Sequence, residues 1–186
     1  MNTVEPIRSL KVLEDMIWRL KMTSDRNYML FLTGIYTGLR ISDILRLKVR
    51  DFRNRDYLYL RAKKTGKETK LCINPVLKKE MARYIEGKAP DEWLFPSRTK
   101  EGGKARPLGR EQAYRIIRDL GRRYGLENIG THSMRKTFGY HMYKNNHYNL
   151  ALLQEIYGHK NPADTLRYIG VSREKANEAI RKFRYA

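Results

Sequence analysis

The sequence predicts a mainly α domain with one small antiparallel β-sheet, an α+β fold class. Apolar residues recur at helical spacing over most of the 186 residues. Two short alternating stretches, rich in β-forming residues, lie near the middle of the chain around a glycine. There is no internal repeat and no linker long enough to divide the chain, so residues 1–186 are expected to form a single domain.

The N-terminal region is expected to contain three helices. The first would begin after Ser9 as its N-cap, with four apolar residues on one face: Leu10, Leu13, Ile17 and Leu20. The second would cover 24–37, and its almost entirely apolar middle is typical of a buried helix. Gly38 should end it. A short third helix would turn three residues inward: Ile41, Ile44 and Leu45.

The middle of the chain has a different pattern. The stretches "DYLYLRA" (56–62) and "TKLCINP" (69–75) alternate like strands, and Gly66 between them predicts the turn of a β-hairpin. We expect a third strand around 49–52. A Gly/Pro/Lys-rich loop at 87–109 should tuck the apolar part of "EWLFPS" inward. The remaining helices are expected at 75–86, 110–124, 131–145, 150–157, shortly after Pro162, and 172–183.

Charge is the strongest signal in the composition. Lysine and arginine number 39 and the acidic residues 20, which gives 39 − 20 = +19. Such a one-sided excess repels itself unless a polyanion neutralises it, so nucleic acid is the expected partner. No apolar run reaches the roughly 20 residues of a membrane helix, and the N-terminus has no signal core. A single cysteine, Cys72, excludes an internal disulfide and fits a cytoplasmic, nucleoid-associated protein.

The stretch "THSMRKTF" (131–138) holds the first candidate site residues. If Thr131 caps a helix, His132 and Arg135 lie at positions i and i+3 on one face near its N-terminus. The free N–H groups and partial positive charge of that end suit a phosphate, to which a histidine could pass a proton. Alone, the pair is more typical of a surface histidine beside an ion-paired arginine.

Three further candidates also have ordinary explanations when each is taken singly. In "YGHK" (157–160), His159 follows a glycine that can end a helix, and could serve only as a cap. Tyr168 in "TLRYIG" (165–170) could be a half-buried packing residue. Arg40 in "TGLRISDIL" could form an ion pair with Asp43 at the edge of the core. Their combination and order are much more specific than any one of them.

In that order, the motifs resemble those of the tyrosine recombinase family, the phage integrases and their relatives. The resemblance runs from Ile7 to Phe183. "TGLRISDIL" is similar to the first-arginine motif and matches Arg40, and "KTG" in the hairpin turn is similar to the lysine motif and matches Lys64, with Lys63 as its neighbour.

"HSMRKTF" is similar to the family's H-x-x-R motif, and "YGH" to its Leu-Gly-His motif with Tyr157 in place of leucine. These match His132, Arg135 and His159. "TLRYIG" places Tyr168 at the expected short distance beyond them.

The resemblance implies a covalent mechanism. Tyr168 would attack the scissile phosphorus and form a 3′-phosphotyrosine link. Arg40 and Arg135 would hold that phosphate from two directions and stabilise the charge that develops on its oxygens. A phenol with a pKa of about 10 needs help to lose its proton at neutral pH, and His132 is the candidate base.

The other matched residues take supporting roles by the same resemblance. Lys64 would protonate the departing 5′ oxygen, and His159 would hydrogen-bond a phosphate oxygen. Asp43, where relatives often carry glutamate, would brace Arg40 or its helix. Neither a metal nor another cofactor is expected.

The resemblance also implies partners. The first partner is double-stranded DNA with specific recombination sites. The second is the chain itself, which would be a monomer in solution and form a tetramer on DNA. Accessory DNA-bending proteins would fit the same scheme. The family's N-terminal DNA-clamp domain is expected to be absent. The segment 171–186, with an apolar stripe on its helix, is expected either to pack on its own domain or to exchange between protomers.

Three other functions stay open at the level of sequence. A type IB topoisomerase-like enzyme would nick and close DNA with the same chemistry but without partner exchange. A non-catalytic DNA-binding module could keep the fold, although binding alone does not need this set of residues. A basic RNA-binding protein is the third, but the long, aromatic-poor helices lack a stacking platform for bases.

Overall fold

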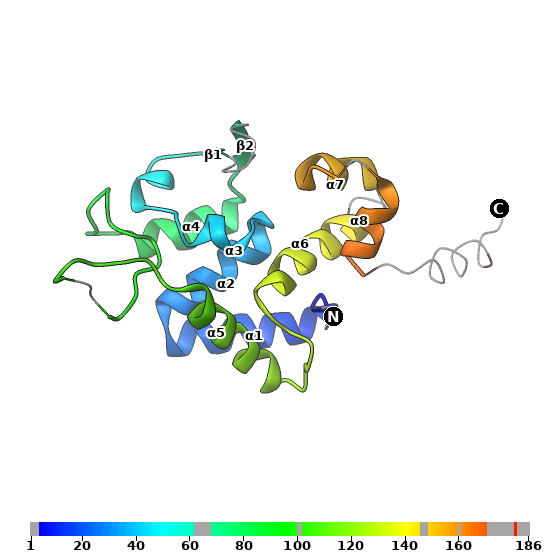
Figure 1. Cartoon of the computed structure of the whole chain (residues 1–186), viewed down its shortest axis with the longest axis horizontal. Helices are drawn as coiled ribbons and strands as arrows, with labels where there is room; N and C mark the ends of the chain where they lie inside the picture. Colours follow the sequence, from blue (N-terminus) through cyan, green and yellow to red (C-terminus); the bar gives the residue numbers. More distant parts are fainter. Residues whose placement is uncertain are drawn as a thin grey trace.

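The computed structural model describes residues 4–61, 68–99, 102–145, 149–159, 161–170 and 181 (Figure 1). Its elements in chain order are α1 (Leu10–Thr23), α2 (Asp25–Thr37), α3 (Ile41–Ile44), the 3₁₀ helix η1 (Val49–Asp51), β1 (Tyr57–Arg61), β2 (Glu68–Cys72), α4 (Pro75–Tyr84), α5 (Arg110–Arg122), α6 (Thr131–Asn145), α7 (Leu150–Tyr157) and α8 (Pro162–Tyr168). The mainly α fold with a small antiparallel sheet is confirmed. Within these ranges, no helix is long and apolar enough to cross a membrane.

Local capping explains where the first helices begin and end. The Ser9 side chain accepts the N–H of Val12, and Ser24 caps α2 in the same way, so the predicted starts are confirmed. Gly38 ends α2 with a left-handed φ of 61°, a conformation in which glycine meets no Cβ penalty. The chain therefore turns sharply just before Arg40.

The predicted hairpin is confirmed, but the predicted third strand is wrong. β1 and β2 pair antiparallel, with Tyr57 opposite Cys72. Residues 49–51 form η1 instead of a strand, because the Asp51 carboxylate accepts the Lys48 N–H at 2.7 Å and closes a tight turn. The buried Val49 and Phe52 lie three residues apart, and a 3₁₀ turn can direct both toward the core.

The main hydrophobic core is built around α2, whose middle is buried on all sides. Helices α1, α4 and α6 all pack against α2. The "EWLFPS" segment contributes Leu94 and Phe95, both fully buried, as the sequence predicts. This gives the α2–α3 turn and α6 a rigid foundation.

A second, smaller apolar cluster lies between α6, α7 and α8. Its buried residues are Leu153, Tyr157 and Ile169. In Figure 1, α7 and α8 (orange) lie against the C-terminal half of α6 (yellow), at a distance from α1 and α2. The expected helix at 172–183 falls outside the described residues, apart from Arg181.

Candidate active site

Helix α6 carries a polar face that begins at its N-terminus. His132, Arg135, Lys136 and Gly139 follow at i, i+3, i+4 and i+7, so they lie on one side of the helix. Thr131 is the first residue of the helix, where the sequence predicted the cap. The start of the helix is stabilised instead by the Ser133 hydroxyl, which accepts the N–H of Gly130 at 3.1 Å.

Arg135 is buried at the centre of this site. The residue is only 6% exposed, and one guanidinium N–H donates to the backbone carbonyl of Gly38. Its guanidinium carbon lies 4.2 Å from the centre of the Tyr157 ring and 5.9 Å from that of Tyr168. Burial lowers the pKa of Arg135, yet a guanidinium stays charged in proteins. The site therefore has a permanent cation at its base.

Arg40 provides a second cation, on the surface. It is exposed, immediately precedes α3, and its carbonyl accepts the N–H groups of Asp43 and Ile44 at 2.9 and 3.1 Å. In the described parts of the chain, no ion pair joins the Asp43 carboxylate to Arg40, so the link between them is through the backbone of α3. The bracing role predicted for Asp43 stays a prediction.

His159 and Tyr168 reach the site from the α7–α8 unit. Gly158 ends α7 with a φ of 68°, and Asn161 caps α8 by accepting the Ala163 N–H at 2.9 Å, both as predicted. The Nδ1 atom of His159 lies 3.1 Å from the hydroxyl of the fully buried Thr165. The ring centres of His159 and Tyr168 are 5.5 Å apart.

The electrostatics of the cluster favour an anion. Burial, followed by the charge of Arg135, lowers the pKa of both His132 and His159, and Arg40 adds to the effect at each. Burial raises the pKa of Tyr168, while the charge of Arg135 opposes the shift. At neutral pH, two fixed cations therefore lie beside neutral imidazoles and a protonated phenol.

Arg135 and His159 lie beside the ring of Tyr168, and Arg40 and His132 lie within electrostatic reach of Arg135. The charge of Arg40 acts on His132, Arg135, His159 and Tyr168 alike. Lys64 and Lys63 lie outside the described residues, in the part of the chain between β1 and β2. The role predicted for Lys64 stays a prediction.

Sequence reasoning missed two residues of the cluster. Lys136 is only 5% exposed, and its amine lies 5.4 Å from the centre of the Tyr168 ring. Its position at i+4 from His132, on the same face of α6, was the available signal. Tyr157 was noted only as a replacement for leucine, although it contacts Arg135, His159 and Tyr168.

An open cavity of about 490 Å³ adjoins His132. It is bounded by Ile41, next to Arg40, and by one side of α5. Three arginines of α5 line it: Arg110, Arg115 and Arg118. Arginines thus continue from the cluster across α5, where Arg115 pairs with Glu111 and Arg118 with Asp119.

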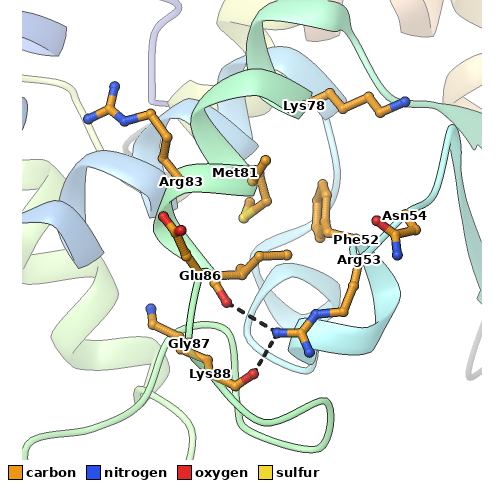
Figure 2. A pocket seen from close by; sticks show the side chains of 11 residues that line it. Phe52, Arg53, Asn54, Lys78, Met81, Arg83, Glu86, Gly87 and Lys88 are labelled. Carbon is orange, nitrogen blue, oxygen red and sulfur yellow. Dashed lines mark hydrogen bonds between the residues drawn. The ribbon is translucent and has the colours of Figure 1, made fainter.

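A second cavity, of about 860 Å³, lies elsewhere and is lined by none of the candidate residues (Figure 2). Arg53 extends into it and donates to the carbonyls of Ile85 and Lys88, at 3.2 and 2.5 Å. Lys78 on its rim pairs with Asp56. Arg53 and Lys78 thus bind other groups of the protein itself, and we assign this cavity no catalytic role. Among the described residues, no group of three or more His, Cys, Asp or Glu side chains could hold a metal ion.

Comparison with known proteins identifies relatives over nearly the whole chain. The family model described as the phage integrase family matches residues 10–175. A probable integrase/recombinase of Bacillus subtilis, YoeC, is 42% identical over 184 residues, which cover 98% of each chain. The tyrosine recombinase XerA of Pyrococcus furiosus is 30% identical over 161 residues, 85% of this chain but 54% of XerA.

Solved structures show the same fold. A crystal structure of XerA recombinase superimposes with a TM-score of 0.76 at 22% identity, over 97% of this chain and 65% of that one. XerH recombinase bound to its palindromic difH substrate gives 0.71 at 21% identity, over 97% of this chain and 54% of that one. This chain therefore spans about half to two thirds of the length of these recombinases, but nearly all of YoeC.

Proposed function

Because this chain belongs to the phage integrase family, we propose that it cuts and rejoins double-stranded DNA at specific sites with Tyr168 as its nucleophile. The activity is that of a tyrosine-type site-specific DNA recombinase. One observation carries the assignment of the site. Arg135 and His159 lie beside Tyr168, Arg40 and His132 lie within electrostatic reach of Arg135, and in the described parts of the chain no carboxylate forms an ion pair with either arginine.

The two arginines are suited to one phosphate. Arg135 is held rigidly by the Gly38 carbonyl, and Arg40 lies just beyond the same turn. Guanidinium groups bind phosphate oxygens through paired N–H donors. As negative charge grows on the equatorial oxygens in the transition state, these fixed cations stabilise it more than they stabilise the ground state. His159 donates a further hydrogen bond to the same phosphate.

The chemical step balances without an external reactant. The Tyr168 oxygen forms a bond to phosphorus as the bond from phosphorus to the 5′ oxygen breaks. His132, neutral because its pKa is lowered by burial and nearby cations, accepts the phenolic proton. Lys64 gives a proton to the departing oxygen. The reverse reaction reseals the strand, because the energy of the phosphodiester is retained in the phosphotyrosine link.

The DNA-free arrangement suggests an order of events. The Arg135 guanidinium carbon lies 5.9 Å from the centre of the Tyr168 ring before DNA is present, and its charge already favours the deprotonated phenol. An incoming phosphate would bind the same guanidinium and so come to lie beside the phenol. The arginine-lined cavity of α5 gives the duplex a basic surface beside the reacting phosphate, where phosphate contacts fix its position.

We extend the proposal to the assembly. The protein is a monomer in solution and a tetramer on paired sites, it acts at the nucleoid, and DNA-bending proteins assist it. Residues 1–186 form one catalytic domain. The support for these points is the family resemblance, together with the DNA-bound state of structural relatives such as XerH.

The direct test is capture of the covalent intermediate. A nicked suicide substrate carrying the recombination site should give an adduct that survives denaturation, and mapping should place the DNA on Tyr168. Exchange of strands between two sites would then separate recombination from simple nicking and closing. Binding to the recombination site without any adduct would contradict the proposal.

A further inference from the structure

Tyr157 occupies an unusual place behind the site. It is the last residue of α7 and only 4% exposed. Its hydroxyl donates to the backbone carbonyl of Arg135 at 2.7 Å, a buried bond between residues 22 positions apart. A buried hydrogen bond to the backbone fixes the distance between α7 and α6 at the residue that carries the central guanidinium.

The ring of Tyr157 contacts the same residue a second time. The guanidinium carbon of Arg135 lies 4.2 Å from the ring centre, within the range of a cation–π interaction. Such contacts are stronger where water is excluded, and both residues are buried. Tyr157 therefore holds Arg135 by its backbone and by its side chain.

The same ring also contacts the residues that arrive from α8 and from the α7–α8 turn. Its centre is 5.3 Å from that of Tyr168, nearly perpendicular to it, and 5.4 Å from that of His159. One buried side chain thus touches the central arginine, the candidate nucleophile and a candidate phosphate ligand.

Helix α6 is shaped to receive it. A Cβ at Gly139 would collide with the Tyr157 hydroxyl and approach Cγ2 of Ile169 to 2.7 Å. Glycine at 139 is therefore what lets the tyrosine reach the helix backbone. Leucine, the residue that the family motif has at position 157, has neither a hydroxyl to donate nor a ring to place under a guanidinium.

We infer that Tyr157 is a positioning residue for cleavage, which aligns Arg135 with Tyr168 across the α6–α7 contact. The inference rests on the proposed function, and Tyr157 acts through its neighbours. Its own hydroxyl is a poor nucleophile, because it is buried, engaged with the Arg135 carbonyl, and has a pKa well above the ordinary value, mainly through burial.

The experiment compares two substitutions with a matched control. Tyr157→Phe keeps the ring and removes the hydrogen bond, and should slow single-turnover adduct formation about three- to tenfold, the factor expected for one net hydrogen bond. Tyr157→Leu removes the ring as well and should slow it further. DNA affinity should stay within about twofold, since no charge is lost. Tyr84→Phe removes a hydroxyl bond of the same kind, to the Leu94 carbonyl at 2.9 Å, outside the cluster, and should leave the rate per folded molecule unchanged.

A double-mutant cycle separates positioning from general stability. In an Arg135→Lys background, adding Tyr157→Phe should cost little more, because the group it aligns is gone. An equal slowing in both backgrounds, or equal slowing by Tyr84→Phe, would overturn the inference.

A second readout does not depend on cleavage. The NMR signal of the Arg135 Nε–H should shift in Tyr157→Leu and stay unchanged in Tyr84→Phe. If wild-type protein forms no adduct, the proposed function fails while this signal still tests the positioning. An Arg135 signal that is unaltered in Tyr157→Leu would overturn the positioning even in an active recombinase.

Discussion

The Arg135 guanidinium donates a hydrogen bond to the carbonyl of Gly38, the glycine that ends α2 two residues before Arg40. The bond joins α6 to the α2–α3 turn. Arg135 contacts this turn through its side chain, and Arg40 follows it directly in the backbone. A neutral carbonyl satisfies the buried donor without cancelling its charge. The positive charge thus remains available to a phosphate, and the Arg135 side chain is held in place before DNA arrives.

Replacement of Tyr168 by phenylalanine should abolish covalent attachment to a nicked suicide substrate and leave DNA affinity nearly intact. The change removes one hydroxyl and no charge. Denaturing electrophoresis measures the adduct, and a filter or anisotropy assay measures binding. Tyr124→Phe is the control, because that hydroxyl donates to the Asp15 carbonyl at 3.0 Å, outside the cluster. A persistent adduct in Tyr168→Phe would assign the nucleophile to another tyrosine.

Alanine at position 40 or 135 should each slow cleavage by about 10²–10³-fold, the loss typical of removing one donor to transition-state charge. Binding should fall less, since other basic residues contact phosphates. Arg83→Ala, on exposed α4 surface beside Glu80, is the control for loss of one positive charge. If binding and cleavage fell in parallel, the arginines would be ordinary DNA contacts.

The same pair should differ in stability. Arg135→Ala leaves the Gly38 carbonyl without its donor in a buried place, which typically costs about 1–3 kcal/mol. Arg40 is exposed, and Arg40→Ala should leave the thermal midpoint almost unchanged. Lysine at position 135 should not restore cleavage, because an ammonium group lacks the planar fork.

For Lys64, outside the described residues, the prediction concerns the leaving group. If Lys64 is the general acid, a substrate with sulfur at the bridging 5′ position should restore cleavage to Lys64→Ala, since a thiolate leaves without a proton. Rescue of Lys63→Ala in its place would move the role one residue back. Rescue of neither would exclude both lysines from the acid step.

The imidazoles should titrate below the ordinary pKa near 6.5 in the DNA-free protein, because burial and then the charge of Arg135 disfavour protonation of His132 and His159. Arg40→Ala should raise both midpoints in an NMR titration. His141, whose pKa is lowered by burial with no contribution from Arg40, should not move. Uniform movement of all three would contradict the local effect of Arg40.

The same shifts have a consequence for stability. The unfolded chain binds protons at these histidines more readily than the folded protein does. Their contribution to stability should therefore decline as the pH falls from about 7 toward 5. Chemical denaturation across that range measures the decline.

Deletion of the residues after Val171 tests the exchange of the C-terminal segment, which lies outside the described residues except for Arg181. The truncated monomer should stay folded, assemble less cooperatively on paired sites, and cleave differently because Tyr168 is held differently. A large loss of thermal stability with unchanged assembly per folded molecule would show that the segment packs on its own domain.

Much of the fold follows from local signals in the sequence. Ser9, Ser24 and Asn161 cap their helices, and Gly38 and Gly158 end theirs, because capping depends on residues a few positions apart. The strand predicted at 49–52 is wrong, because Val49 and Phe52, three positions apart, would face opposite sides of a strand but the same side of a 3₁₀ turn.

The site was predicted by the order of motifs, but not by its internal contacts. Nothing local to Arg135 indicates that it is buried against the Gly38 carbonyl, 97 positions away in the chain. The contact of Tyr157 with the same arginine joins α7 to α6 in the same way. Such contacts depend on how helices pack, and neither periodicity nor residue type at one position specifies them.

The small apolar cluster of α6, α7 and α8 places Tyr168, the proposed nucleophile, in a packing unit separate from the main core. With far less buried apolar surface than the core around α2, this unit should open in local fluctuations at a lower free energy than global unfolding. Its amide protons should exchange with solvent deuterium earlier than those of α2. Such opening would displace Tyr168 from the site reversibly, while the core around α2 stays folded.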